Sequence, residues 1–127
     1  MPGELESVAM GFVAALDAMD LDRMMESALD DAQGIDEISR RWIRGREELD
    51  GYLRGLMGAV SNVRTELRDV EERMWGDTGM VTCWLEQDYE LEGNSQHVSA
   101  PTTIVMRRQD GEWKLALFHS APLPEEG

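Results

Sequence analysis

Thiols, histidines and long apolar segments are scarce in this sequence of 127 residues. Its single cysteine, Cys83, has no partner for an internal disulfide and no second thiolate with which to begin a zinc site. The two histidines, His97 and His119, lack the spacing and partners of a metal site, so we expect no metal. No apolar run approaches the roughly 18 residues that cross a bilayer.

Positive charge is also scarce, with 12 Lys and Arg residues against 26 Asp and Glu residues and a formal net charge of −14. Such a surface repels phosphate backbones and anionic headgroups, so we expect no nucleic acid or membrane partner. The acidic residues are spread along the chain, which indicates a solvated acidic surface rather than a disordered tail. The lone cysteine and the start without a basic leader predict a cytoplasmic protein.

The length leaves room for one domain with one core. We found no repeats, low-complexity segments or linkers, so the sequence predicts a single domain over residues 1–127. Residues 122–127, which contain two prolines and two glutamates, are expected to form a loose tail.

Helical periodicity dominates the first half of the chain. Residues 4–18 place apolar side chains at spacings of three and four, which predicts an amphipathic helix. Asp20 is placed to cap a second, short helix. A third helix is expected after Gly45, whereas residues 30–44 are interpreted as a loop with a short strand.

After Asn62 the pattern changes to alternation between turn dipeptides, which is typical of antiparallel strands. We expect these strands near residues 63–75, 79–92, 96–108 and 112–121. The predicted fold class is therefore α+β: three N-terminal helices packed on a curved, four-stranded antiparallel sheet, plus a short extra strand, that encloses a conical pocket.

The last two expected strands carry apolar side chains on both faces. Leu115 and Leu117 lie on one face of the last strand, and Ala116 and Phe118 lie on the other. Strands of this kind are usually covered on both faces. Because the helices can cover only one face, we expect a homodimer through the other.

Three segments in order resemble the nuclear transport factor 2-like superfamily, which includes ketosteroid isomerase and the SnoaL-like cyclases. They are the end of the first helix at 15–21, the stretch Trp-Ile-Arg-Gly-Arg-Glu-Glu-Leu at 42–49, and the segment from Arg107 through His119. The resemblance implies a cystatin-like α+β cone with a pocket between helices and sheet, usually in a homodimer. It does not decide between enzymes and catalytically silent modules.

Two residues are candidates for acid–base chemistry. His119 follows Trp113 by six positions, so a regular strand would point both toward the helices. Its imidazole could move a proton near neutral pH, or it could be a buried histidine satisfied by a neighbour. Tyr89 lies on the expected core-facing side of its strand and could donate to a developing oxyanion, or its hydroxyl could be structural.

The expected pocket lining depends on the turn at 109–111. A two-residue turn would align Thr102, Ile104 and Met106 with Trp113, whereas a three-residue turn with a bulge would align Thr103 and Val105. The resemblance favours the second arrangement. The predicted lining is therefore Phe12, Trp42, Leu85, Thr103, Val105, Trp113 and Leu117. Trp42 would either close the pocket mouth or cover the core.

These features favour a protein that binds a small apolar molecule of unknown identity. The sequence has no dinucleotide fingerprint or phosphate-binding loop, so we expect no cofactor. Any chemistry would then be acid–base isomerisation, dehydration or cyclisation. Two alternatives remain open: a pocket that only binds a ligand, and a homodimerisation module with a closed core.

Overall fold

The computed structural model describes residues 3–123, and its N-terminal part contains two helices. Helix α1 spans Glu4–Asp17 and buries Leu5, Ala9 and Val13, as its apolar spacing predicts. Helix α2 spans Leu21–Glu26 and begins at Asp20, whose carboxylate accepts from the amide of Arg23 at 3.2 Å. The expected cap is therefore confirmed.

The segment between the second and third helices is more ordered than the sequence pattern indicates. It forms strand β1 (Ala28–Ile35) and the two-residue strand β2 (Ile43–Arg44). Helix α3 (Gly45–Ala59) follows directly and packs against β1.

Four long strands complete the chain: β3 (Val60–Trp75), β4 (Thr78–Leu91), β5 (Asn94–Gln109) and β6 (Glu112–Ser120). The sheet has six strands in the order β2-β1-β6-β5-β4-β3. It is mixed, because β1 pairs in parallel with β6. The predicted α+β class is confirmed, whereas the purely antiparallel sheet with four main strands is corrected.

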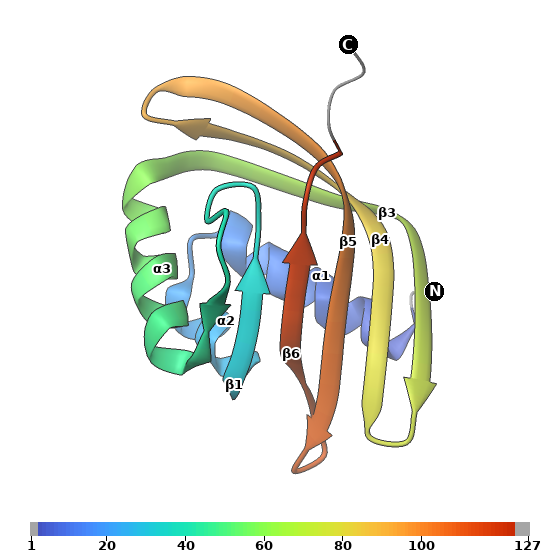
Figure 1. The fold of residues 1–127 in the computed structure, drawn as a ribbon. Coiled ribbons are helices and arrows are strands. Elements are labelled where there is room, and N and C mark those ends of the chain that lie inside the picture. The colour runs from blue at the N-terminus through green and yellow to red at the C-terminus, as the bar shows by residue number, and fades with distance from the viewer. Residues whose placement is uncertain (1–2, 124–127) are drawn as a thin grey trace.

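The sheet curves around the helices, with α1 lying across it and α3 beside β1 and β2 (Figure 1). We call the face that these helices cover the inner face and the opposite one the outer face. Burial alternates along β4 and β5, so Val81, Leu85 and Ile104 are inner-face residues. Of the expected tail, Pro122 and Leu123 are exposed beyond β6, and residues 124–127 lie outside the described part.

The β5–β6 hairpin has the two-residue turn. Gln109 pairs with Glu112, and the two residues between them both have positive φ, 53° at Asp110 and 81° at Gly111. Asp-Gly adopts this geometry at little cost, and such a turn matches the twist of the strands. Consequently Thr102, Ile104 and Met106, rather than Thr103 and Val105, share the inner face with Trp113.

A β-bulge then changes the direction of the side chains in β6. Val105 pairs with Leu117 and the next residue, Met106, pairs with Leu115, so Ala116 is an extra residue. An extra residue reverses the alternation of every residue beyond it. Phe118 and Ser120 therefore point to the inner face, and His119 points to the outer face.

Candidate functional site

Two adjoining hollows lie between the helices and the inner face of the sheet. The larger, which we call the apolar chamber, has a volume of about 70 Å³ and lies among α1, α3, β1 and β6. The smaller, the polar chamber, has a volume of about 40 Å³ and lies closer to β3 and β4. Leu16, Asp36, Leu56 and Phe118 line both chambers.

The polar chamber gathers hydrogen-bonding side chains from distant parts of the sequence. Its polar lining consists of Asp36, Glu37, Gln87, Tyr89 and Ser120, set among leucine, valine and isoleucine side chains. A mainly apolar hollow with a few convergent polar groups is the usual form of a small-molecule site. These chambers are therefore the candidate functional site.

Asp36 follows β1 directly, and its carboxylate is held in a defined position. Oδ1 accepts from the amides of Ile38 at 2.9 Å and Ser39 at 2.7 Å, and from the hydroxyl of Tyr52 at 2.8 Å. Among residues 3–123, Oδ2 receives only the longer contact from that same hydroxyl, at 3.0 Å. The turn and α3 thus occupy one oxygen and leave the other available to a bound molecule.

Glu37 and Tyr89 share the polar chamber with Asp36. Burial raises the pKa of the Glu37 carboxyl, with a smaller contribution from the charge of Asp36. Burial also raises the pKa of the Tyr89 hydroxyl, which keeps it protonated as a hydrogen-bond donor at neutral pH. The chamber therefore combines an oriented carboxylate, a carboxyl with increased affinity for its proton, and a neutral phenol.

The structure brings three of the predicted site residues to these chambers. Phe12 lines the apolar chamber, and Leu85 and Tyr89 line the polar chamber. Trp113 also lies on the inner face, but it packs against Leu5 and Ala9 in a separate part of the core and lines neither chamber.

The other predicted residues lie elsewhere, because the turn and the bulge set a different register. Thr103, Val105, Leu117 and His119 lie on the outer face, so the expectation that they point toward the helices is wrong. Trp42 is 38% exposed and stacks on His119 with ring centroids 5.9 Å apart. It closes neither chamber.

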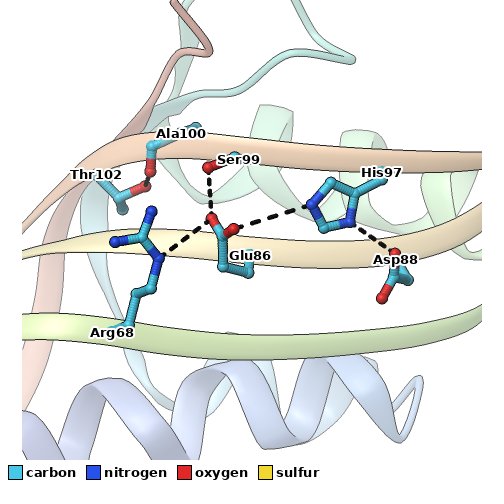
Figure 2. Close-up of polar contacts among 7 residues, drawn as sticks. All are labelled: Arg68, Glu86, Asp88, His97, Ser99, Ala100 and Thr102. Atoms are coloured by element: carbon cyan, nitrogen blue, oxygen red, sulfur yellow. Dashed lines mark hydrogen bonds and ion pairs between the residues drawn. The ribbon is translucent and has the colours of Figure 1, made fainter.

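The outer face carries its own polar network (Figure 2). Glu86 lies at its centre, 3.8 Å from Nε of Arg68, 3.9 Å from Nε2 of His97 and 2.5 Å from the hydroxyl of Ser99. His97 Nδ1 lies 2.7 Å from Asp88. Exposed pairs of this kind are weak. The hollow on this face, lined in part by Trp84, Thr103 and His119, has a volume of about 570 Å³, but it is more open to solvent than the two chambers and its lining is half polar. The two chambers are therefore the stronger candidate for the site.

Sequence analysis missed Asp36, Glu37 and the role of Tyr52. Tyr52 occupies a helical position whose spacing indicates only burial, and Asp36 and Glu37 stand in a segment without clear periodicity. Their one local signal is Asp-x-x-Ser at Asp36 and Ser39, a pattern that favours turns in many proteins.

Two further properties concern residues 3–123. No group of three or more His, Cys, Asp or Glu side chains is placed to hold a metal ion there. None of the helices in this range is long and apolar enough to cross a membrane.

Comparison with known proteins places this geometry in a family. A candidate dehydratase of the nuclear transport factor 2-like family from Streptomyces avermitilis superposes with a TM-score of 0.87 at 20% identity, covering 96% of each chain. A ketosteroid isomerase-like protein from Erwinia carotovora gives 0.80 at 17% identity, covering 94% of each chain. A Nostoc punctiforme protein of unknown function with a cystatin-like fold gives 0.77 at 18% identity, covering 95% of this chain and 90% of its own.

At these identities the solved structures show a shared fold. No curated protein matches the sequence. The family model of the SnoaL-like domain matches residues 5–124, which is nearly the whole chain. Together with the helix-covered curved sheet, this match shows that the chain belongs to the SnoaL-like domain family.

Proposed function

We propose that this chain binds a small, largely apolar molecule in the two chambers and transfers a proton on it without a cofactor. Asp36 accepts the proton, and Tyr89 donates a hydrogen bond to the oxygen on which negative charge develops. The observation that carries this proposal is Asp36, which lines both chambers and whose Oδ2 has Tyr52 as its single hydrogen-bond partner among residues 3–123.

The surroundings of Asp36 suit a general base. Its orientation is set before a ligand binds, because two main-chain amides and Tyr52 hold Oδ1. A base that needs no reorientation loses less free energy when the reaction occurs. Tyr89 lines the same chamber as a neutral donor, which is the charge state that stabilises an oxyanion.

The volume of the two chambers limits the size of the ligand. The apolar chamber, about 70 Å³, has room for roughly two water molecules at their volume in the liquid, and the polar chamber for about one. This favours a molecule with one ring rather than several. A carbonyl beside a C–H bond would place its oxygen near Tyr89 and its acidic carbon near Asp36, as isomerisation or dehydration requires. The names of the dehydratase and isomerase-like neighbours agree with this reaction class.

Exchange of the α-protons of cyclohexanone in D₂O, followed by proton NMR, tests the proposal. Asp36 would remove an α-proton and return deuterium, so the chain should accelerate exchange above the buffer rate. Asp36→Asn should reduce the catalysed rate by roughly 100-fold or more. Tyr89→Phe should reduce it by roughly 10- to 100-fold, since it removes one oxyanion donor.

His119→Asn is the matched control, because His119 lies on the outer face. It should leave the exchange rate unchanged. Loss of exchange in His119→Asn but not in Asp36→Asn would contradict the proposal and favour a site on the outer face.

We also propose that a second copy of this chain covers the outer face. Trp84, Val105 and Leu117 lie there half-buried in the single chain. Arg68 lies 3.8 Å from Glu86 and the ring of His97 lies 2.7 Å from Asp88 on this face, so both carboxylates have partners here although the chain as a whole carries a charge of −14. Repulsion between like-charged surfaces disfavours contact elsewhere.

A further inference from the structure

A chain of hydrogen bonds connects α1 to the polar chamber through β3. Thr65 donates its main-chain amide to Asp17 Oδ2 at 2.9 Å and its hydroxyl to Asp17 Oδ1 at 2.7 Å. An ionised carboxylate only accepts hydrogen bonds, so the single proton of the Thr65 hydroxyl is used in this contact. The hydroxyl oxygen can then only accept from its next neighbour.

That neighbour is Gln87 on β4, whose Nε2 lies 3.0 Å from the Thr65 hydroxyl oxygen. In the reverse orientation, Gln87 Oε1 would face the hydroxyl oxygen of Thr65, whose only proton is already donated to Asp17. The proton order from Asp17 through Thr65 therefore fixes which end of the Gln87 amide faces β3.

The carbonyl oxygen of Gln87 is the end left over. The residue is 8% exposed and lines the polar chamber. No donor among residues 3–123 forms a hydrogen bond with Gln87 Oε1. Every side-chain oxygen in that range that is sealed from solvent has a hydrogen-bond partner, so the unpartnered Oε1 is not sealed. The oxygen is therefore in contact with the open volume of the chamber and available to whatever fills it.

We propose that Gln87 is a specificity-determining residue that selects ligands carrying a hydroxyl or N–H donor at the end that enters the polar chamber. This inference rests on the proposed function and narrows its substrate class. A molecule without such a donor would displace water from Oε1 and leave a buried acceptor unpaired, which costs binding free energy.

Gln87 and Tyr89 together indicate which polar groups the substrate carries. Tyr89 offers a donor and Gln87 offers an acceptor in the same chamber. A ligand that satisfies both carries a carbonyl together with a hydroxyl or amine. Hydroxycarbonyl compounds with one ring meet both requirements of the proposed site.

The test compares two probes of similar size, cyclohexanol, which has a hydroxyl donor, and cyclohexanone, which has none. Dissociation constants for both are measured by NMR titration on the full chain and on Thr65→Val and Thr65→Ser. Valine keeps the shape of threonine without its hydroxyl, whereas serine keeps the hydroxyl. The ratio of the two constants cancels changes in the chamber that affect both probes equally.

In Thr65→Val the Gln87 amide loses its fixed orientation, so the preference for cyclohexanol over cyclohexanone should fall by roughly three- to ten-fold. Thr65→Ser should keep the preference of the unaltered chain. Gln87→Met removes the acceptor itself and should reduce the preference in the same way as Thr65→Val. It supplies the same test if the valine substitution disturbs the fold.

Two other outcomes distinguish failure of the specificity inference from failure of the proposed binding site. An unchanged ratio in both Thr65→Val and Gln87→Met overturns this inference and leaves the proposed binding site intact. Failure of both probes to bind the unaltered chain overturns the proposed site, and the inference with it.

Discussion

The hydroxyl of Tyr52 on α3 lies 2.8 Å from Oδ1 and 3.0 Å from Oδ2 of Asp36, at the end of β1. This contact joins a helix to the turn that carries the candidate base. It is also one reason, after burial and the charge of Asp36, that the pKa of Tyr52 is raised. The hydroxyl therefore stays protonated at neutral pH and donates to Asp36.

Tyr52→Phe removes this hydrogen bond and little else. A hydrogen bond to a half-buried charged group contributes about 1 to 2 kcal/mol to the free energy of unfolding, and we expect a loss of that size in urea titrations. Tyr89→Phe is the matched control, since no partner bonds its hydroxyl among the described residues. Equal losses in the two variants would show that Tyr52 does not hold Asp36.

The pH dependence of stability should report on Glu37. Burial raises its folded-state pKa above 4.5, so between 4.5 and the raised value the folded chain binds more protons there than the unfolded chain. The free energy of unfolding therefore falls as pH rises through this window. Above the window, ionised Glu37 opposes folding.

Glu37→Gln stays neutral at every pH and should remove that cost. Urea titrations from pH 4 to pH 8 should show the variant gaining stability over the unaltered chain as pH rises, with little difference at pH 4. A difference that stays constant across the series would mean that Glu37 is not desolvated.

Two glycines should respond oppositely to alanine. A Cβ on Gly79 would lie 2.5 Å from Cδ1 of the fully buried Leu5, so Gly79→Ala should destabilise the fold by about 1 to 3 kcal/mol. A Cβ on Gly55 in α3 meets nothing within 4 Å, so Gly55→Ala should stabilise it by about 0.5 to 1 kcal/mol. Urea denaturation measures both changes, and a Gly79→Ala variant of unaltered stability would contradict the close packing of α1 on β4.

The proposed dimer predicts a particle of twice 14.3 kDa by light scattering. Val105→Arg places a charge in the middle of the outer face and should yield the 14.3 kDa monomer. Gln109→Arg, at the exposed end of the same strand, should leave the dimer intact. A monomeric unaltered chain would remove this proposal.

Patterns among neighbouring residues predicted most of the helices, strands and turns. The remaining elements depend on pairing between strands that are far apart in the sequence. The apolar spacing of 4–18 and the Asp110-Gly111 turn are properties of adjacent residues, so they can be recognised in one sequence. Strand β1 was expected only as a short strand within a loop at 30–44, because its length depends on pairing with β6, at the other end of the chain.

The candidate site was harder to predict, because one residue changes which side chains face it. The bulge at Ala116 sends His119 outward and Ser120 inward, and no apolar alternation in β6 indicates its position. Tyr89 was placed correctly because β4 alternates without interruption up to it. Asp36 becomes a candidate only when α3 and the sheet close around it.

The most direct test of this account is to locate a bound ligand by methyl NMR during titration with cyclohexanone. Binding in the two chambers predicts progressive shifts of the Leu16 and Leu56 methyl signals, since both residues line both chambers. The methyl signals of Val105 and Leu117 on the outer face should stay constant. Shifts confined to Val105 and Leu117, or no shifts at saturating probe, would contradict the central claim that the helix-covered face holds the site.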